Sequence, residues 1–245
     1  NTGYQNLMRL STIANLDGFY YKPRIDHDLL ERYHEGIIAL SACIGGEVGD
    51  ALRQGQYEQA KEVALWYKQV FGDRYYLELQ DHGHPDHPHA WDEQVRVNAE
   101  LIKLSKELDI PCAVTMDAHY LRHEDQEAHE ILLCVQTGSF IDDASRMSLK
   151  EFELHIADPL DVIARWQDTF PEAISNTKAI ADRCEITLEL GRILIPKFPL
   201  PDGVTEKQHL DELVYQGLVM RYGEQVPVDK GSLSVEEAKT YLPEN

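Results

Sequence analysis

The sequence predicts an α/β fold, because three short apolar runs alternate with segments of helical periodicity. The runs cover residues 37–40, 75–79 and 112–115, and each has the length and composition of a buried strand. Strands separated by helices form parallel sheets, since a parallel pair needs a long crossover connection. We therefore expect a parallel sheet built in the order strand, helix, strand, helix, strand, helix.

Four helices are expected beside these strands. The first begins after Asp26, a favourable N-cap residue, and ends at Gly36, while the second ends at Gly72. The third precedes Pro111 and the fourth ends at Gly138. Their apolar residues recur three or four positions apart, as helices require. In chain order these residues are Leu29, Leu30 and Tyr33; Ala60, Val63, Ala64, Tyr67 and Val70; Val95, Ile102 and Leu108; Ala128, Ile131, Leu132 and Val135.

The pattern changes after about residue 157. Helical spacing at 162–166 and 174–180 is followed by a strand-like run at 186–190. Residues 195–203 then hold three prolines, which neither a helix nor a central strand accommodates, so we expect an extended connector there. Residues 204–222 predict one more helix, and the polar tail from Gln225 is expected to be loosely held. We divide the chain into domains at 1–190 and 191–245.

Composition limits the classes of function. The net charge of −20, from 43 acidic and 23 basic residues, argues against an extensive nucleic-acid surface, although a pocket that meets only a strand end is compatible with it. No apolar run approaches the ~20 residues of a membrane span, and no secretory signal is present. The four cysteines form no CxxC pair, which favours a reduced cytoplasm. The first residue, Asn1, leads us to expect that the chain was cut from a longer one.

Residue types that bind metals follow all three predicted strands. Cys43 follows the first, His82 follows the second, and Asp117 and His119 follow the third. Sites in parallel α/β folds gather at the carboxyl ends of the strands. Imidazole and carboxylate together suit zinc, manganese or iron, and a thiolate favours the softer metals. A carboxylate such as Asp117 can bridge two metals, the usual arrangement for phosphoester hydrolysis.

Several of these residue types have an alternative, structural interpretation. Cys43 is either a ligand or half of a Cys–His nucleophile pair, and Glu78 is either a ligand or the interior partner of another polar group. Seven of the eleven histidines lie between His82 and His129. His84, His87 and His89 are typical of a solvated loop, His123 and His129 of a surface, and Cys112, Cys134 and Cys184 of small buried side chains. The motifs GxxxxGK[ST], GxGxxG, GxSxG and HExxH are all missing.

A set of segments from residue 1 to residue 223 resembles, in order, the bacterial DNA polymerase III alpha-subunit family. The resemblance covers far more of the chain than any single motif. Its segments are Asn1–Leu7, Gly18–Tyr20, Lys22–Asp26, Glu35–Ser41, Tyr75–Gly83, Thr115–Tyr120, Ala128–Leu133, Asn176–Thr177, Ala181–Cys184 and Pro196–Pro199.

The resemblance implies a fold and a set of ligands. The fold is a distorted (β/α)7 PHP-type barrel lacking its first strands, followed by a mostly helical segment that leads towards the polymerase palm. Cys43, His82, Asp117 and His119 correspond to metal ligands, with Asp117 and His119 as the catalytic residues. Glu78, which the resemblance does not assign, is expected from its place in the second strand to support them. The first metal motifs of the family would precede Asn1. The palm, with its catalytic aspartates, would follow Asn245, so no polymerase active-site residue is expected in the chain.

The implied function is that of a fragment of a replicative DNA-directed DNA polymerase whose PHP site, holding Zn²⁺ or Mn²⁺, hydrolyses the 3′ end of DNA as a 3′–5′ exonuclease. The parent would use Mg²⁺ at its polymerase site and contact DNA, the sliding clamp, the clamp loader and the proofreading subunit, away from any membrane. One alternative is a non-catalytic PHP scaffold that stabilises the polymerase and docks replisome subunits. A second is a stand-alone PHP phosphoesterase. A barrel without its first strands exposes edges, so we expect the isolated chain to be marginally stable.

Overall fold

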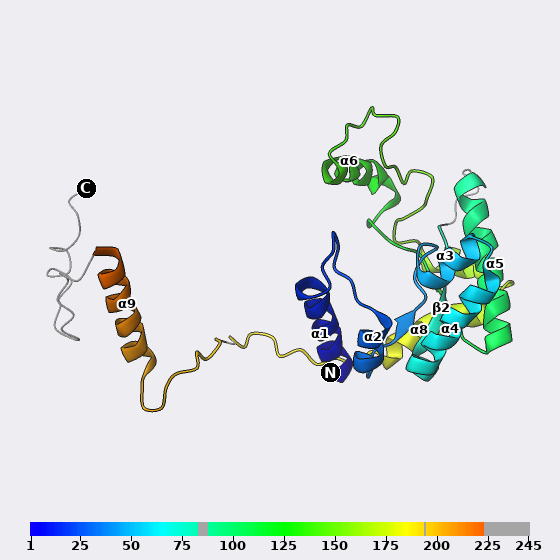
Figure 1. Cartoon of the computed structure of the whole chain (residues 1–245). Coiled ribbons are helices and arrows are strands. Elements are labelled where there is room, and N and C mark those ends of the chain that lie inside the picture. The colour runs from blue at the N-terminus through cyan, green and yellow to red at the C-terminus, as the bar shows by residue number, and fades with distance from the viewer. Residues whose placement is uncertain (83–87, 194, 223–245) are drawn as a thin grey trace. The chain divides into compact units, whose positions relative to one another are not determined.

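A computed structural model describes residues 1–82, 88–193 and 195–222 (Figure 1). The internal contacts of the chain divide it into two units, residues 1–187 and 188–245. The domain boundary expected at residue 190 stays a prediction. None of the helices in the described ranges has the length and apolar character needed to cross a lipid bilayer.

The first unit contains the predicted parallel sheet. Its strands are β1 (Ala39–Leu40), β2 (Tyr75–Gln80) and β3 (Cys112–Thr115), in the order β1-β2-β3. Both pairings are parallel, with Ala39 opposite Tyr75 and Leu77 opposite Cys112. The α/β class is therefore confirmed, whereas the seven-stranded barrel stays a prediction because the described residues form three strands.

The first strand is two residues shorter than predicted. Ile37 does not join the ladder, because its N–H donates to the carbonyl of His34 (3.1 Å) and its carbonyl accepts from the Arg74 guanidinium (2.6 Å). These bonds hold Ile37 in a turn. Pairing with β2 therefore begins at Ala39.

The four helices expected beside the strands are all present. They are α2 (His27–Tyr33), α4 (Tyr57–Phe71), α5 (Pro88–Leu108) and α6 (Gln126–Thr137). The Asp26 carboxylate accepts from the N–H of Leu29 at 2.9 Å, as an N-cap does. Gly72 and Gly138 end α4 and α6 with φ values of 61° and 68°, which glycine adopts at little cost.

Two helices were missed by the sequence analysis, α1 (Thr2–Leu16) and α3 (Glu47–Arg53). The apolar residues of α1 are interrupted by polar ones, and only Asn6, Leu10 and Ala14 are buried on its inner face. The α3 helix has seven residues, too few for a clear periodic signal. The expected helices after residue 157 are α7 (Pro159–Trp166) and α8 (Pro171–Arg183), and short 3₁₀ turns cover Gly72–Arg74 and His123–Asp125.

The core surrounds β2, which is buried on both faces. Tyr75, Leu77 and Leu79 are fully buried, and they pack with residues of α3, α4 and α5 (Figure 1). On the β3 side, α8 contributes Ala173 to the core, and Asn176 donates to the carbonyl of Cys112 at 2.8 Å. A strand that is covered on both sides has a nearly continuous run of apolar residues, which is why β2 could be predicted from the sequence.

Two structural predictions near the end of the first unit were wrong. Residues 186–190 do not form a strand, and Ile186 and Leu188 are more than half exposed, so burial does not favour an extended ladder there. Cys184, expected to be buried, is exposed just past the end of α8. Cys112 and Cys134 are buried as predicted.

The second unit consists of the connector and one helix. Residues 195–203 are irregular, as their prolines predict, and α9 covers Glu206–Tyr222, within two residues of the predicted helix. The side chains of Leu210, Leu213 and Val214 on α9 are about half exposed or more. The predicted polar tail from Gln225 lies outside the described residues.

Candidate metal centre

The candidate centre lies where β2 and β3 end. Gln80 is opposite Thr115 in the register, and the N–H of Asp81 donates to the Thr115 carbonyl at 2.9 Å. The loops that leave the two strands therefore start side by side. One carries His82 and the other carries Asp117 and His119, which is the juxtaposition predicted from parallel pairing.

The Asp117 carboxylate lies between two imidazoles. Its Oδ2 atom is 3.3 Å from Nε2 of His82, and its Oδ1 atom is 3.4 Å from Nε2 of His119. Asp117 adopts a left-handed backbone with φ of 48°, a conformation that aspartate tolerates better than most residues. This turn of the backbone lets His119, two residues on, also face the carboxylate. We call His82, Asp117 and His119 the histidine cluster.

His82 is the most enclosed member of the histidine cluster. It is 8% exposed, its Nδ1 atom has no hydrogen-bond partner in the described structure, and its Nε2 atom faces Oδ2 of Asp117 at 3.3 Å. Burial lowers the pKa of His82 although the nearby Asp117 carboxylate acts in the opposite direction. The ring is thus held in the neutral form, the form that binds metals. The Phe152 ring packs edge-on against it, with centroids 5.2 Å apart.

The donors of the histidine cluster fit part of a divalent-metal site. Two ligand atoms on one tetrahedral zinc ion are roughly 3.4 Å apart when each bond is about 2.1 Å. The two N···O separations match that spacing, and the buried Nδ1 atom of His82, which has no partner among the described residues, is open to a bound group. However, each carboxylate oxygen faces a different histidine. Among the described residues, no group of three or more His, Cys, Asp or Glu side chains is arranged to hold a metal ion.

Asp81, next to His82, makes contacts that stabilise the fold. Its side chain is fully buried, and its Oδ2 atom accepts from Nε of Arg165 and Nε1 of Trp166, both at 2.8 Å. Arg165 and Trp166 end α7, so this carboxylate ties the loop after β2 to a helix about 85 residues away in sequence. Sequence spacing gave no signal for this contact.

Glu78 makes the contacts of an interior polar partner. Its Oε1 atom accepts from the Thr115 hydroxyl at 2.6 Å and from the Gln80 amide at 3.4 Å. Its backbone N–H donates to the Ser41 hydroxyl at 2.9 Å. Glu78 therefore links the ends of all three strands.

Cys43 lies in a separate loop after β1. Its side chain is exposed, its sulfur accepts from the N–H of Gly45 at 3.4 Å, and the described hydrogen bonds and ion pairs join it to no member of the histidine cluster. The loop is tightly wound, since Ala42 has a left-handed φ of 62° and a Cβ atom on Gly49 would lie 2.5 Å from the Cys43 carbonyl oxygen. A left-handed residue, Ala42, thus precedes the predicted ligand Cys43, and the predicted ligand Asp117 is itself left-handed.

The other histidines are distributed unevenly. His129, expected at the surface, is half-buried against His119, with ring centroids 5.3 Å apart. Burial, and then the neighbouring His119, lower the pKa of His129. His123 is exposed as predicted and packs against His155. His84 and His87 lie outside the described residues, and His89 lies in the first turn of α5 rather than in a loop.

Comparison with known proteins identifies the relatives of the chain. Residues 1–82 match the family model of the PHP domain, a range that includes Cys43 and His82. The DNA polymerase III subunit alpha of Borreliella burgdorferi is 39% identical over 222 residues. The subunits of Deinococcus radiodurans and Thermus aquaticus are each 38% identical, over 228 and 233 residues.

The matches cover most of this chain but little of each relative. They include 90%, 90% and 92% of the chain and 19%, 16% and 18% of the three relatives, respectively. The chain therefore spans under a fifth of the length of these curated relatives. The resemblance predicted from the sequence is confirmed, because the chain is homologous along nearly its whole length to a segment of DNA polymerase III alpha subunits.

Proposed function

We propose, from this homology to a segment of the DNA polymerase III alpha subunit, that the chain is part of a replicative DNA-directed DNA polymerase and contributes to a PHP metal site with 3′–5′ exonuclease activity. The observation that carries the nuclease is the histidine cluster. Its three side chains converge at the ends of adjacent parallel strands, and His82 is buried there with its Nδ1 atom unpartnered in the described structure and its Nε2 atom against the Asp117 carboxylate. We propose that the parent protein is cytoplasmic and that it copies the chromosome with Mg²⁺ at its polymerase site.

The residues of the histidine cluster would hold Zn²⁺ or Mn²⁺, with Cys43 at the neighbouring strand end as a further ligand. Such an ion, when bound, supplies Lewis-acid chemistry for phosphodiester hydrolysis. His82 offers a neutral nitrogen, and Asp117 directs one oxygen to each side. The side chains of Asp117 and His119 are about one-third exposed and would be accessible to substrate, whereas His82 is nearly buried.

The charge of the chain limits how DNA reaches this site. With a net charge of −20, the chain repels a long duplex, so the substrate is the 3′ end of a single strand delivered by other parts of the polymerase. Duplex binding, the sliding clamp, the clamp loader and the proofreading subunit belong to surfaces of the parent.

The incomplete donor set favours one alternative, a PHP scaffold without catalysis. On each side of the Asp117 carboxylate the described residues supply one imidazole nitrogen beside one carboxylate oxygen, and they form no group of three metal-binding side chains. In that case metal would contribute to folding and to docking of replisome subunits. A stand-alone phosphoesterase is less favoured, because the match to polymerase subunits covers nine-tenths of the chain.

The test uses the full-length polypeptide and a single strand labelled at its 3′ end, with added Mn²⁺ or Zn²⁺. Asp117→Asn keeps the size of the side chain and removes its charge. The matched control is Asp182→Asn on α8, whose carboxylate pairs only with Lys178 at the surface among the described contacts.

A nuclease predicts that Asp117→Asn lowers strand trimming by at least about 100-fold while primer extension and the control stay unchanged. The proposal fails if the wild type does not trim the strand under either metal. If Asp117→Asn then also loses bound metal and melts at a lower temperature, the scaffold alternative holds.

A further inference from the structure

One short segment connects the two loops of the histidine cluster. We call residues 152–156 the bridging segment. The N–H of Glu153 donates to the His82 carbonyl at 3.2 Å, and the Leu154 carbonyl accepts from the N–H of His119 at 2.7 Å. The segment continues as a parallel bridge beside Tyr120, and Leu154 is almost completely buried. The backbones of His82 and His119 are therefore linked through consecutive residues of the bridging segment.

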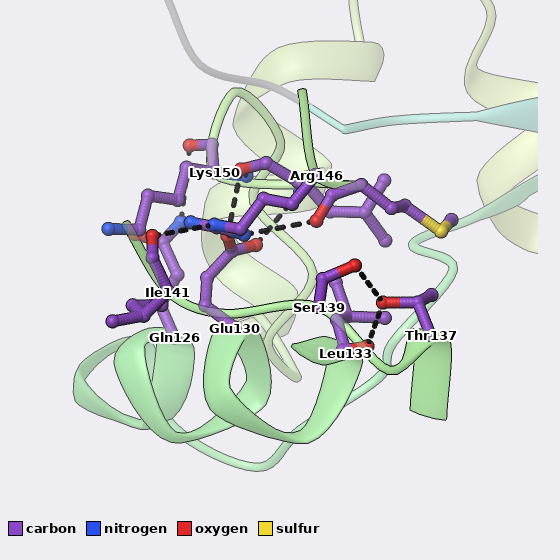
Figure 2. Close-up of polar contacts among 11 residues, drawn as sticks. Gln126, Glu130, Leu133, Thr137, Ser139, Ile141, Arg146 and Lys150 are labelled. Atoms are coloured by element: carbon purple, nitrogen blue, oxygen red, sulfur yellow. Dashed lines mark hydrogen bonds and ion pairs between the residues drawn. The ribbon is translucent and has the colours of Figure 1, made fainter. Parts of the chain in front are cut away.

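The residues just before the bridging segment are attached to α6 through Glu130 (Figure 2). The Glu130 side chain is completely buried and accepts three hydrogen bonds. The N–H of Leu149 donates to Oε1 at 2.8 Å, while the Ser148 hydroxyl and the Arg146 guanidinium donate to Oε2 at 2.8 and 2.6 Å. We call Glu130, Arg146, Ser148 and Leu149 the Glu130 network.

The Glu130 network is joined to the bridging segment by a single turn. The N–H of Phe152 donates to the Leu149 carbonyl at 3.1 Å, so residues 149–152 have little freedom to extend. Gln126, one turn before Glu130 on α6, donates weakly to the carbonyls of Lys150 and Phe152. Movement of residues 146–149 would therefore be transmitted directly to Phe152 and Leu154.

The charge of Glu130 is needed for this attachment. Burial acts to raise the pKa of Glu130, but the hydrogen bonds from Leu149, Arg146 and Ser148 outweigh it and leave the pKa below its usual value. The ionised carboxylate can accept at both oxygens. A glutamine in its place would turn an N–H₂ group towards one set of these donors.

We propose that Glu130 is a positioning residue for the metal site, because its carboxylate fixes the bridging segment and thereby the separation of His82 from His119. In the described part of the chain, the hydrogen bonds and ion pairs of Glu130 reach Arg146, Ser148 and Leu149 and no member of the histidine cluster. The role in metal binding rests on the proposed function, whereas the mechanical link between Glu130 and the two loops does not.

The experiment compares Glu130→Gln with wild type in the full-length polypeptide. Glu127→Gln is the matched control, since Glu127 lies on the same helix, in its first turn, and is exposed. One readout is backbone hydrogen exchange of the metal-free protein in peptides covering 117–121 and 152–156. The other is the Kd for Zn²⁺, measured by competition with a chelator.

A positioning role predicts that Glu130→Gln speeds exchange of both peptides by about 10-fold or more and weakens Zn²⁺ binding by about 10-fold to 100-fold. Peptides covering β2 should keep their protection, and Glu127→Gln should match wild type. Ser148→Ala, which removes one of the three hydrogen bonds, should change both readouts in the same direction by less.

The proposal is overturned if Glu130→Gln speeds exchange at 146–156 while exchange at 117–121 stays at the wild-type rate. It is also overturned if exchange changes at both but Zn²⁺ affinity does not. If β2 also loses protection in Glu130→Gln, the variant is destabilised throughout the unit. The same two criteria are then applied to the milder variant Ser148→Ala. If wild type binds no Zn²⁺, the proposed metal site fails, and the exchange of 117–121 still reports whether Glu130 positions the loop.

Discussion

Carboxylates in two regions of this molecule have opposite surroundings. Asp81 and Glu130 are fully buried, and each accepts hydrogen bonds at 2.6–2.8 Å from an arginine and at least one other donor. Asp117 is 38% exposed and lies between two imidazoles at 3.3 and 3.4 Å, in a left-handed backbone conformation. Asp81 and Glu130 hold distant segments together, whereas the Asp117 carboxylate remains able to bind a metal ion.

The difference shows how a small sheet supports a site. Buried charges are tolerated only when they are fully paired, and removing one partner leaves the other at a large cost. A carboxylate that must bind a ligand cannot be paired in that way. The rigid pairs at Asp81 and Glu130 therefore lie outside the histidine cluster, whereas the cluster holds only long contacts to Asp117 and a His82 Nδ1 atom without a partner among the described residues. The following changes test this contrast.

The largest effect is expected from Asp81→Ala. It would leave the buried indole N–H of Trp166 and the guanidinium of Arg165 without their acceptor. The expected loss is about 3 kcal/mol in the free energy of opening around β2. Hydrogen exchange of the 75–80 peptide in the full-length polypeptide measures it. A loss below about 1 kcal/mol would contradict the contrast, because Asp81 would then be as weakly paired as Asp117.

A pH series separates charge from shape at Glu130. Its pKa is below the usual 4.5, so its ionised form stabilises the fold at neutral pH, and this stabilisation is lost as pH falls below 4.5 through the lowered pKa. At pH 7 we expect the free energy of opening of residues 146–156 to be about 2 kcal/mol higher in wild type than in Glu130→Gln. Because glutamine does not titrate, the difference should shrink in acid.

Hydrogen exchange corrected for the intrinsic rate at each pH measures this difference for residues 146–156. A gap between wild type and Glu130→Gln that is independent of pH from 7 to 3 would contradict an ionised Glu130. Glu127→Gln provides the baseline for an exposed glutamate on the same helix.

A smaller effect is expected at Asp26, far in sequence from either group of carboxylates. Asp26→Ala removes the N-cap bond to Leu29 and should destabilise α2 by about 1 kcal/mol. The readout is faster exchange in a peptide covering 27–33, with unchanged exchange at 117–121. Faster exchange at 117–121 as well would mean that exchange there reports general loosening rather than the Glu130 network.

The smallest effect on stability is expected at Asp117 itself. Asparagine tolerates the left-handed conformation at least as well as aspartate, and no strong hydrogen bond is lost. Without metal, Asp117→Asn should change the opening free energy of β3 by less than about 0.5 kcal/mol, while Zn²⁺ affinity falls. A loss as large as that of Asp81→Ala would show that Asp117 is a structural carboxylate.

Part of this organisation could be predicted from local sequence. Asp26, Gly72 and Gly138 marked helix ends correctly because caps depend on neighbouring backbone groups. The convergence of His82 with Asp117 and His119 followed from parallel pairing of two buried strands. The strand predicted at 186–190 failed because alternating apolar residues do not form a strand without a partner to pair with.

The sequence by itself determined the α/β order, the buried strands β2 and β3 and the residues delivered at their ends, because these depend on short-range periodicity and on the direction of parallel strands. Only the tertiary structure decided that Asp81 binds Trp166, that Glu130 holds residues 146–149, and that the bridging segment joins His82 to His119. Those contacts join residues up to 85 positions apart through single hydrogen bonds. Such bonds leave no periodic pattern in the sequence. Only the folded structure therefore shows that Asp81 and Glu130 are paired and that Asp117 remains available to a metal ion.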